Sequence, residues 1–280
     1  MADPLHASLP VDRTASEVRN RSFMLRRRLG YMAADSLDRL LRLTGAENHR
    51  FLVDRLHQDI YRDGFELAPG IVCRPDPCSV GRTPQGELTG ASAADLIRAR
   101  GLSDLAVLDI CCGIGLVGLS MLVRLRDVHP IVHMSFADIN VFNINTVKKT
   151  LENADPAALG GVATETFLSD QLAGIPPARQ FDVIVSNPPH FDAPAFTEGT
   201  LDPVALGNAD PAWAFHREFY RAAHEYLTPR GEVWFFENGE ASSVELLLPY
   251  IEANPELEYV RSFPDRRDSR FFWMVTRGRG

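Results

Sequence analysis

The stretch that decides the fold is Val107-Leu108-Asp109-Ile110-Cys111-Cys112-Gly113-Ile114-Gly115-Leu116-Val117-Gly118. Its apolar beginning predicts the end of a buried strand, and its apolar end predicts the start of a helix. Gly113 and Gly115 let the backbone between these elements turn tightly and approach a ligand, because neither carries a Cβ atom. The stretch therefore predicts a strand, a ligand-binding loop and a helix in direct succession.

Strands and helices alternate along the chain outward from this stretch. Strands are expected at 105–110, 131–137, 162–168, 181–186, 231–237, 257–263 and 270–276, and helices at 91–100, 116–126, 140–153, 211–227 and 242–253. The alternation predicts an α/β fold: a Rossmann-like, seven-stranded, mostly parallel sheet with helices on both faces. The last two strands are too close for a helical crossover, so the last strand is expected to run antiparallel.

Two regions are expected. Residues 1–65 include a stretch of helical periodicity and are predicted to form a small N-terminal helical segment, either a cap or a dimerisation surface. Residues 66–280 are predicted to form the main domain. At their start, residues 66–90 are rich in Pro, Gly and Thr and are expected to form a short hairpin or loop that approaches the ligand-binding edge.

Composition limits the possible partners and compartment. The net charge of −8 argues against a nucleic-acid partner, because proteins that bind phosphates carry basic patches. No apolar run is long enough to cross a bilayer, and the N-terminus lacks the features of a secretory signal, so a cytoplasmic protein without a membrane partner is expected. Cys73 and Cys78 have no second ligand pair downstream, so no metal site is expected and the cysteines are expected to be reduced.

Acidic residues occur at the ends of the first three core strands. Asp109 lies inside the glycine stretch, where a carboxylate can accept from an ammonium group but would disfavour a pyrophosphate. Asp138 ends the second strand, where a carboxylate can hold both hydroxyls of a ribose. Ser169-Asp170 ends the third strand and could bind an adenine amine. One such acid would usually cap a helix, but three at successive strand ends favour a cofactor site.

The motif Asn187-Pro188-Pro189-His190 follows the strand predicted at 181–186. A central strand cannot continue through two prolines, because each lacks the N–H that the ladder needs. The strand is therefore expected to expose Asn187 at its carboxyl end, the edge where ligands bind in open parallel sheets. This stiff turn offers an amide oxygen, prolyl carbonyls and an aromatic ring, a combination that suits a flat group bearing N–H.

Together these motifs resemble the class I S-adenosylmethionine-dependent methyltransferases. Among them the chain looks most like the N-methyltransferases with an Asn-Pro-Pro-aromatic motif, especially the glutamine-amide methyltransferases of peptide release factors. The resemblance covers residues 66–276 and includes the segments 109–118, 136–140, 169–170, 187–189 and 236–239. It implies S-adenosylmethionine as the cofactor, bound by Asp109, Cys111, Gly113, Gly115, Gly118, Asp138, Ile139, Asn140, Ser169, Asp170 and Asn187.

The same resemblance implies that Asn187, Pro188, Pro189 and His190 are catalytic. The Asn187 side chain and the Pro188 carbonyl would accept hydrogen bonds from the target nitrogen and aim its lone pair at the sulfonium methyl, so that catalysis is mainly positioning. His190 stands where the family usually has Tyr or Phe, and it can stack, titrate or donate a hydrogen bond.

The residues around this motif are acidic. Residues 190–216 contain no Lys or Arg, and the predicted substrate-binding residues are His190, Asp192, Glu198, Asp202, Glu237 and Glu240. They favour a small cationic amino-acid-like substrate, such as an arginine guanidinium, slightly over a protein glutamine. Each of these acids could instead belong to a solvated surface loop.

Further hypotheses with different partners or chemistry stay open at this point. The motif could hold a flipped adenine of RNA or DNA. The chain could also be a non-catalytic cofactor-binding partner protein, or a nicotinamide oxidoreductase, although Asp109 within the glycine stretch and the Asn-Pro-Pro motif speak against the oxidoreductase. The N-terminal helices make a homodimer possible.

Overall fold

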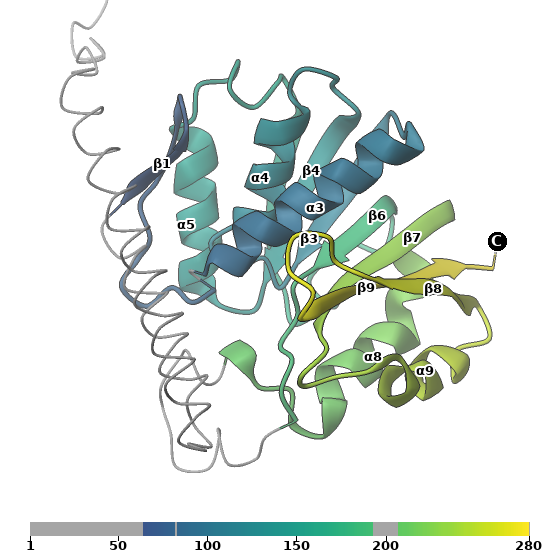
Figure 1. The fold of residues 1–280 in the computed structure, drawn as a ribbon. Coiled ribbons are helices and arrows are strands. Elements are labelled where there is room, and N and C mark those ends of the chain that lie inside the picture. The colour runs from purple at the N-terminus through teal and green to yellow at the C-terminus, as the bar shows by residue number, and fades with distance from the viewer. Residues whose placement is uncertain (1–63, 82, 193–206, 280) are drawn as a thin grey trace, which may run out of the picture.

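The computed structural model describes residues 64–81, 83–192 and 207–279, and the predicted N-terminal segment lies outside them except for its last two residues (Figure 1). The strands of the main sheet are β3 (Leu105–Ile110), β4 (Ile131–Asp138), β5 (Ala163–Leu168), β6 (Phe181–Ser186), β7 (Leu227–Asn238), β8 (Leu257–Pro264) and β9 (Phe271–Gly278). The helices are α3 (Pro84–Arg100), α4 (Leu116–Leu125), α5 (Val141–Glu152), α8 (Ala214–Ala222) and α9 (Val244–Glu252), with 3-10 turns η1 (Pro211–Trp213) and η2 (Ala223–Tyr226).

The sheet has the predicted topology. Its seven strands lie in the order β5-β4-β3-β6-β7-β9-β8, with β3, β4, β5, β6 and β7 paired in parallel. The last strand, β9, is antiparallel to both of its neighbours. The reversal between β3 and β4 on one side and β6 on the other creates a switch point, where open α/β sheets bind ligands.

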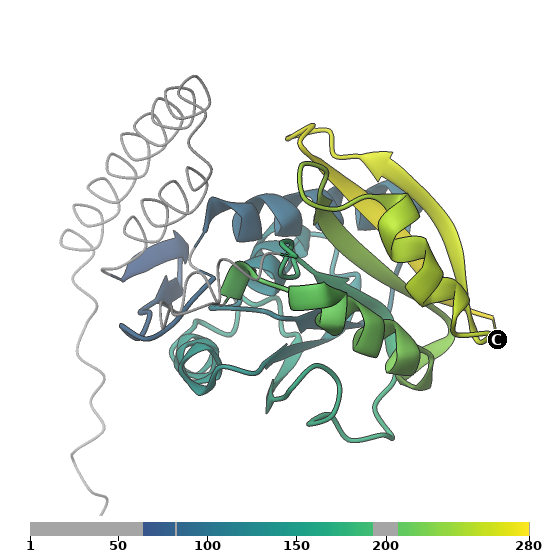
Figure 2. The same cartoon turned by 90° about the horizontal axis from the view of Figure 1, so that it is seen from below.

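Helices cover both faces of this sheet (Figure 2). Alternate residues of each strand point to opposite faces, so Val107 of β3 joins the core beneath α3, α4 and α5, while its neighbour Leu108 joins the core beneath α8 and α9. Both residues are fully buried. This double burial explains why the β3 sequence is almost continuously apolar rather than alternating.

A small hairpin precedes the sheet, as the composition of this segment predicts. β1 (Phe65–Ala68) and β2 (Ile71–Cys73) pair antiparallel. The predicted start of the next helix is wrong: α3 begins at Pro84 rather than at residue 91. Proline is favoured in the first turn of a helix, and the helix continues through Gly86 and Gly90 because tertiary packing outweighs their poor helix propensity.

The predicted helix over 211–227 is also interrupted. It consists of η1, α8 and η2, with Ala212 and Trp213 at positive φ values of 53° and 54°. Strand β7 begins at Leu227 instead of residue 231, since Leu227 pairs with Phe181 of β6. These two residues lie in one core cluster, and this packing extends the strand through a Pro-Arg-Gly segment that is typical of a turn.

The crossing of α3 and α4 gives a stability prediction. A Cβ added to Gly90 would lie 2.3 Å from the Val117 carbonyl oxygen and 2.7 Å from Ser120 Cβ. Gly90→Ala is therefore expected to lower the free energy of unfolding by about 1–3 kcal/mol, because the two helices must separate. Urea denaturation measures the loss. Gly278→Ala, where a Cβ meets nothing within 4 Å, is the control, and equal stability of the two variants would contradict the prediction.

Candidate active site

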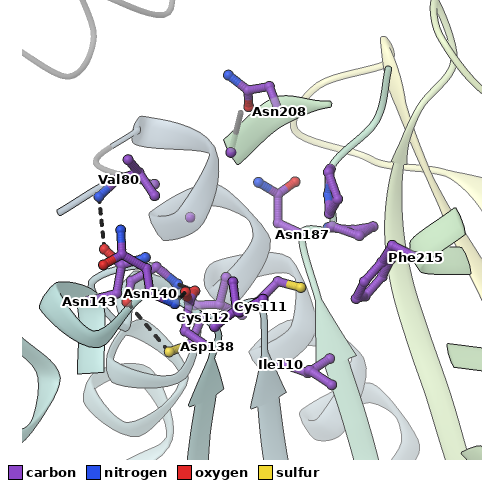
Figure 3. A pocket seen from close by; sticks show the side chains of 18 of the residues that line it. Val80, Ile110, Cys111, Cys112, Asp138, Asn140, Asn143, Asn187, Asn208 and Phe215 are labelled. Atoms are coloured by element: carbon purple, nitrogen blue, oxygen red, sulfur yellow. Dashed lines mark hydrogen bonds between the residues drawn. The ribbon is translucent and has the colours of Figure 1, made fainter. Parts of the chain in front are cut away.

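A cavity of about 450 Å³ lies at the carboxyl ends of the parallel strands (Figure 3). Its wall is formed by Val80, Gly81, Thr83, Gly86, Ile110, Cys111, Cys112, Gly113, Leu116, Val117, Asp138, Ile139, Asn140, Asn143, Ser169, Asp170, Gln171, Asn187, Pro188, Pro189, Gly207, Asn208, Ala209 and Phe215. The structure thus places the glycine stretch, the second and third strand ends and the Asn-Pro-Pro motif around one space. Asp109, Gly115, Gly118 and His190 are buried and are not among the residues that line the cavity.

The loop after β3 requires an unusual backbone. Gly113 and Gly115 have φ values of 55° and 82°, and Cys111 also has a positive φ of 54°. A Cβ on Gly113 would lie 3.2 Å from both Gly81 Cα and the Val80 carbonyl oxygen. The segment before α3 therefore lies directly against the glycine loop, and only the absence of a side chain allows this approach.

Asp109 connects the end of β3 to the first turn of α4, on the far side of this loop. It is fully buried, and its Oδ2 accepts a hydrogen bond from the Gly118 backbone N at 2.8 Å, one of the unpaired donors at the start of α4. Its other oxygen, Oδ1, has no hydrogen-bond partner among the described residues. Burial raises the pKa of Asp109 to about 8, so the carboxyl group holds its proton at neutral pH.

The raised pKa predicts a pH-dependent stability difference. An acid whose folded pKa exceeds its unfolded value loses stability as pH rises between the two, here from 3.8 to about 8. Asp109→Asn cannot ionise, so its free energy of unfolding relative to wild type should increase by about 1.4 kcal/mol per pH unit across this window. Urea denaturation at several pH values measures the difference. The exposed Asp104→Asn is the control, and a pH-independent difference for Asp109→Asn would refute the prediction.

Asp138 is held at the cavity by its own loop. Its Oδ2 accepts from Gly113 N and its Oδ1 accepts from Asn140 N, both at 2.8 Å. Asn140 in turn caps α5 by accepting from Phe142 N at 2.9 Å. The Asp138 side chain is nearly buried, and burial raises the pKa of its carboxyl group. The carboxylate is thus fixed at the cavity wall by two backbone donors.

The remaining predicted cofactor residues follow β4 and β5. Ile139 is 67% exposed beside the cavity, an apolar surface open to a ring. Ser169 Oγ donates to Gln171 O at 2.6 Å and accepts from Gly174 N at 2.9 Å, so this hydroxyl shapes the loop. Asp170 lines the cavity and is exposed.

These features fit S-adenosylmethionine. The backbone of the loop at Gly113 lines the cavity, and Asp138 offers a carboxylate at the second strand end, where ribose hydroxyls bind in this type of sheet. Ile139 and Asp170 offer an apolar surface and a polar group for an adenine. Of the predicted cofactor residues, all except Asp109, Gly115 and Gly118 line this cavity.

Two cavity residues that contact each other, Asn143 of α5 and Val80 of the segment before α3, are missing from the sequence prediction. Asn143 is fully buried on α5, and its Oδ1 accepts from Val80 N at 2.8 Å. An asparagine on the buried face of a predicted helix was the available signal, because buried polar groups need partners. Val80 itself lies in a segment without periodicity, and nothing in its sequence marks it as part of the wall.

The Asn-Pro-Pro motif is fixed at the end of β6. Ser186 Oγ donates to Ile110 O at 2.6 Å and ties β6 to β3. Asn187 then lines the cavity, and its Oδ1 lies 3.1 Å from Nε2 of His190. His190 is only 6% exposed, and its backbone N donates to Asn208 O at 3.0 Å. Residues 207–209 thereby cross over the motif and add to the wall.

Behind the motif lies a buried group of charges that the sequence does not reveal. His216 lies between two carboxylates: its Nδ1 is 2.6 Å from Asp210 Oδ2 and its Nε2 is 3.0 Å from Glu237 Oε1. Although burial alone lowers the pKa of His216, Glu237 and Asp210 raise it to about 9. Burial alone raises the pKa of Glu237, but His216 and His190 hold it well below its usual range. The network therefore contains an imidazolium between two carboxylates.

The predicted substrate-binding acids are not brought together by the described residues. Glu237 is fully buried in this network, and Glu240 is exposed beyond the end of β7. Asp192 is exposed, and its Oδ1 accepts from Ala212 N at 2.7 Å. Glu198 and Asp202 lie outside the described residues. Among those described, the acids on the cavity wall are Asp138 and Asp170.

Comparison with known proteins gives a consistent family. The methyltransferase small domain matches residues 95–257. The "Release factor glutamine methyltransferase" of Burkholderia pseudomallei is 33% identical over 174 residues, which cover 59% of this chain and 58% of that protein. The "Ribosomal RNA small subunit methyltransferase C" of Pasteurella multocida is 27% identical over 144 residues, which cover 51% of this chain and 34% of that protein. The chain thus spans less than two thirds of the length of these curated relatives.

Solved structures include a 16S rRNA N2 G1207 methyltransferase from T. Thermophilus in complex with AdoMet and guanosine. It is 18% identical, with a TM-score of 0.45, and the match covers 70% of this chain and 43% of that chain. Among the described residues, none of the helices combines the length and the apolar character needed to cross a membrane.

Proposed function

This chain belongs to the methyltransferase small domain family, and we propose that it transfers the methyl group of S-adenosylmethionine to the side-chain amide nitrogen of a glutamine in a protein. The name of the Burkholderia relative supports this substrate, as does the Asn-Pro-Pro motif at the cavity. The observation that carries the proposal is the uncharged character of the wall around Asn187.

The cavity has two ends of different character (Figure 3). Asp138 and Asp170 follow β4 and β5, on one side of the glycine loop, whereas Asn187 follows β6 on the other side. The cavity is also lined by the uncharged residues Ile110, Cys111, Pro188, Pro189, Asn208, Ala209 and Phe215, whereas His190, whose Nε2 is 3.1 Å from Asn187 Oδ1, is not among the lining residues. A neutral amide enters such a space without a counter-charge, while an unpaired guanidinium would lose its hydration at considerable cost.

The motif would act by positioning the acceptor nitrogen. The Asn187 side chain and the Pro188 carbonyl would accept the two N–H groups of a primary amide and thereby orient the nitrogen's lone pair. When bound, S-adenosylmethionine supplies an electrophilic methyl group on its sulfonium. Holding the nitrogen in line with this methyl group converts an encounter in solution into a positioned reaction, which is worth several kcal/mol of the barrier. The nitrogen releases its proton to solvent after attack.

The sequence favours a cationic substrate because of its acidic residues, but the positions of the described acidic residues do not support that substrate. Glu237 is bonded to His216 and Ser242 rather than open to the cavity. A free arginine therefore becomes the second acceptor to test. Ribosomal RNA is the third, because two of the curated relatives are named for ribosomal RNA methylation; the net charge of −8 stands against it. Homodimerisation through residues 1–65 and a cytoplasmic location remain predictions.

Labelling with S-adenosylmethionine that carries a marked methyl group tests the proposal. Three acceptor pools are offered separately: release-factor protein, free amino acids including arginine, and RNA or DNA. We expect label in the protein pool, on a glutamine side chain identified by peptide mass analysis. Label on free arginine would overturn the proposal and would support the predicted role of the acidic residues in substrate binding. Label in nucleic acid would also overturn it, and would show that the net charge of −8 does not exclude a nucleic-acid acceptor. Calorimetric binding of S-adenosylhomocysteine shows in each case that the cofactor site is intact.

A further inference from the structure

The side-chain amide of Asn187 has two ends of opposite character, since Oδ1 accepts hydrogen bonds and Nδ2 donates them. An acceptor substrate that carries N–H needs Oδ1 on the cavity side. In the structure Oδ1 itself lies 3.1 Å from Nε2 of His190, so Nδ2 is the end of the amide turned away from that ring. A half-turn of the terminal torsion exchanges oxygen and nitrogen almost isosterically. Which atom faces the cavity therefore depends on whether Nε2 of His190 donates or accepts.

The ring of His190 is held in one place. It packs edge-on against Phe271 with ring centroids 5.9 Å apart and against Phe191 at 6.4 Å. Its backbone N is bonded to Asn208 O, and the residue is 6% exposed. With Nε2 directed at Asn187, the other ring nitrogen, Nδ1, lies 3.6 Å from Oε2 of Glu237. The two ring nitrogens thus face an amide on one side and a carboxylate on the other.

The carboxylate of Glu237 is negatively charged and buried. Its Oε1 is bonded to His216, and its Oε2 accepts from Ser242 Oγ at 2.9 Å. His216 also contacts Asp210, so it donates through both nitrogens and forms one cation between two anions. The network carries one net negative charge beside Nδ1 of His190. A bare lone pair on Nδ1 would face this charge, whereas an N–H there is attracted to it.

We propose that Glu237 holds the His190 ring in the Nδ1–H tautomer, so that the Asn187 amide makes a half-turn, its Nδ2 donates to the bare Nε2, and its oxygen faces the acceptor substrate. His190 is then a positioning residue that acts through Asn187. This role rests on the proposed function only in that Asn187 is the group that binds the acceptor. A phenylalanine in place of His190 would preserve the ring packing but leave the Asn187 amide free to turn over.

Nitrogen-15 NMR of protein labelled at histidine tests the tautomer without any acceptor. At mildly alkaline pH the wild-type spectrum is expected to contain one ring with a proton on Nδ1 and a bare Nε2, and this signal should be missing from His190→Phe. In Glu237→Gln the proton should move to Nε2, because the negative charge beside Nδ1 is gone. Ser242→Ala is the matched control: it removes the other donor to Oε2 of Glu237 and should leave the proton on Nδ1. A wild-type His190 with a proton on Nε2 alone, or on both nitrogens, would overturn the proposal.

A kinetic comparison adds a readout that packing alone would not change. His190→Gln keeps an acceptor near the position of Nε2, whereas His190→Phe does not. With release-factor protein as acceptor, His190→Phe should lose about 10-fold or more in kcat with little change in KM, and His190→Gln should recover most of that loss. Equal kcat for both variants and wild type would overturn the positioning role. If release-factor protein takes up no label, the spectra still decide the tautomer, so failure of the proposed function is a separate result.

Discussion

Replacement of Asn187 by alanine is expected to lower kcat for methyl transfer by about 100- to 1000-fold, the usual effect of removing one positioned polar group from a reacting centre. Asn187 lies at the end of β6 on the cavity wall, where its amide would accept an N–H of the acceptor. Without it, the nitrogen's lone pair is no longer aimed at the methyl group. Initial rates of label transfer to release-factor protein measure the change.

Although Asn187 is also among the predicted cofactor residues, the same variant should lose much less affinity for S-adenosylhomocysteine than kcat, because the glycine loop and Asp138 are untouched. Isothermal titration calorimetry measures this affinity. Asn153→Ala removes an asparagine at the exposed end of α5 and should leave both kcat and affinity unchanged. If affinity and kcat of Asn187→Ala fell in parallel, Asn187 would serve the cofactor and not the acceptor.

The second large effect concerns His216. His216→Phe is expected to lower the free energy of unfolding by about 3–5 kcal/mol, because Asp210 and Glu237 would remain as two buried carboxylates without the cation between them. Phenylalanine keeps a flat ring at this buried position but is larger than histidine, so the pH dependence of the loss is what separates charge from packing. Urea denaturation measures it. His133→Phe is the matched control, since His133 also pairs with a carboxylate, Glu165, but both side chains are partly open to solvent, which lowers the contribution of such a pair toward about 1 kcal/mol.

The pH dependence of this loss follows from the two shifted groups. The raised pKa of His216 provides stability that is complete below 6.5 and is lost as pH rises through about 9. The lowered pKa of Glu237 provides stability above 4.5 that is lost as pH falls. The cost of His216→Phe should therefore be largest between these two limits and should shrink toward pH 9. A cost independent of pH would show that His216 acts only by packing.

Short apolar runs and sequence motifs predicted those strands and loops whose conformation is set by residues close in the sequence. The bounds of β3 and β6 agree with the structure, because each is a short apolar run ended by glycine or proline. The family expected from the motifs is confirmed by the match over residues 95–257. The start of α3 was missed because Gly86 and Gly90 weaken a helix locally, and only contact with α4 explains their presence within one.

Contacts between distant parts of the chain were not predictable in the same way. Glu237 and His216 are separated by 21 residues and belong to a strand and a helix, so no spacing rule pairs them. An acid at the end of a strand looks the same in the sequence whether it faces a substrate or a buried histidine. Asp138 was easier to interpret, because its partners Gly113 and Asn140 belong to motifs that are recognisable on their own.

The contact between Gly81 and the glycine loop means that the ligand site extends beyond the region that the family shares. The family match begins at residue 95, yet Val80, Gly81, Thr83 and Gly86 form part of the cavity wall. A protein trimmed to the matched region would retain β3 to β7 but lack one side of the enclosure. A comparison of ligand sites that is limited to the matched region would thus leave out the segment that closes this side of the cavity.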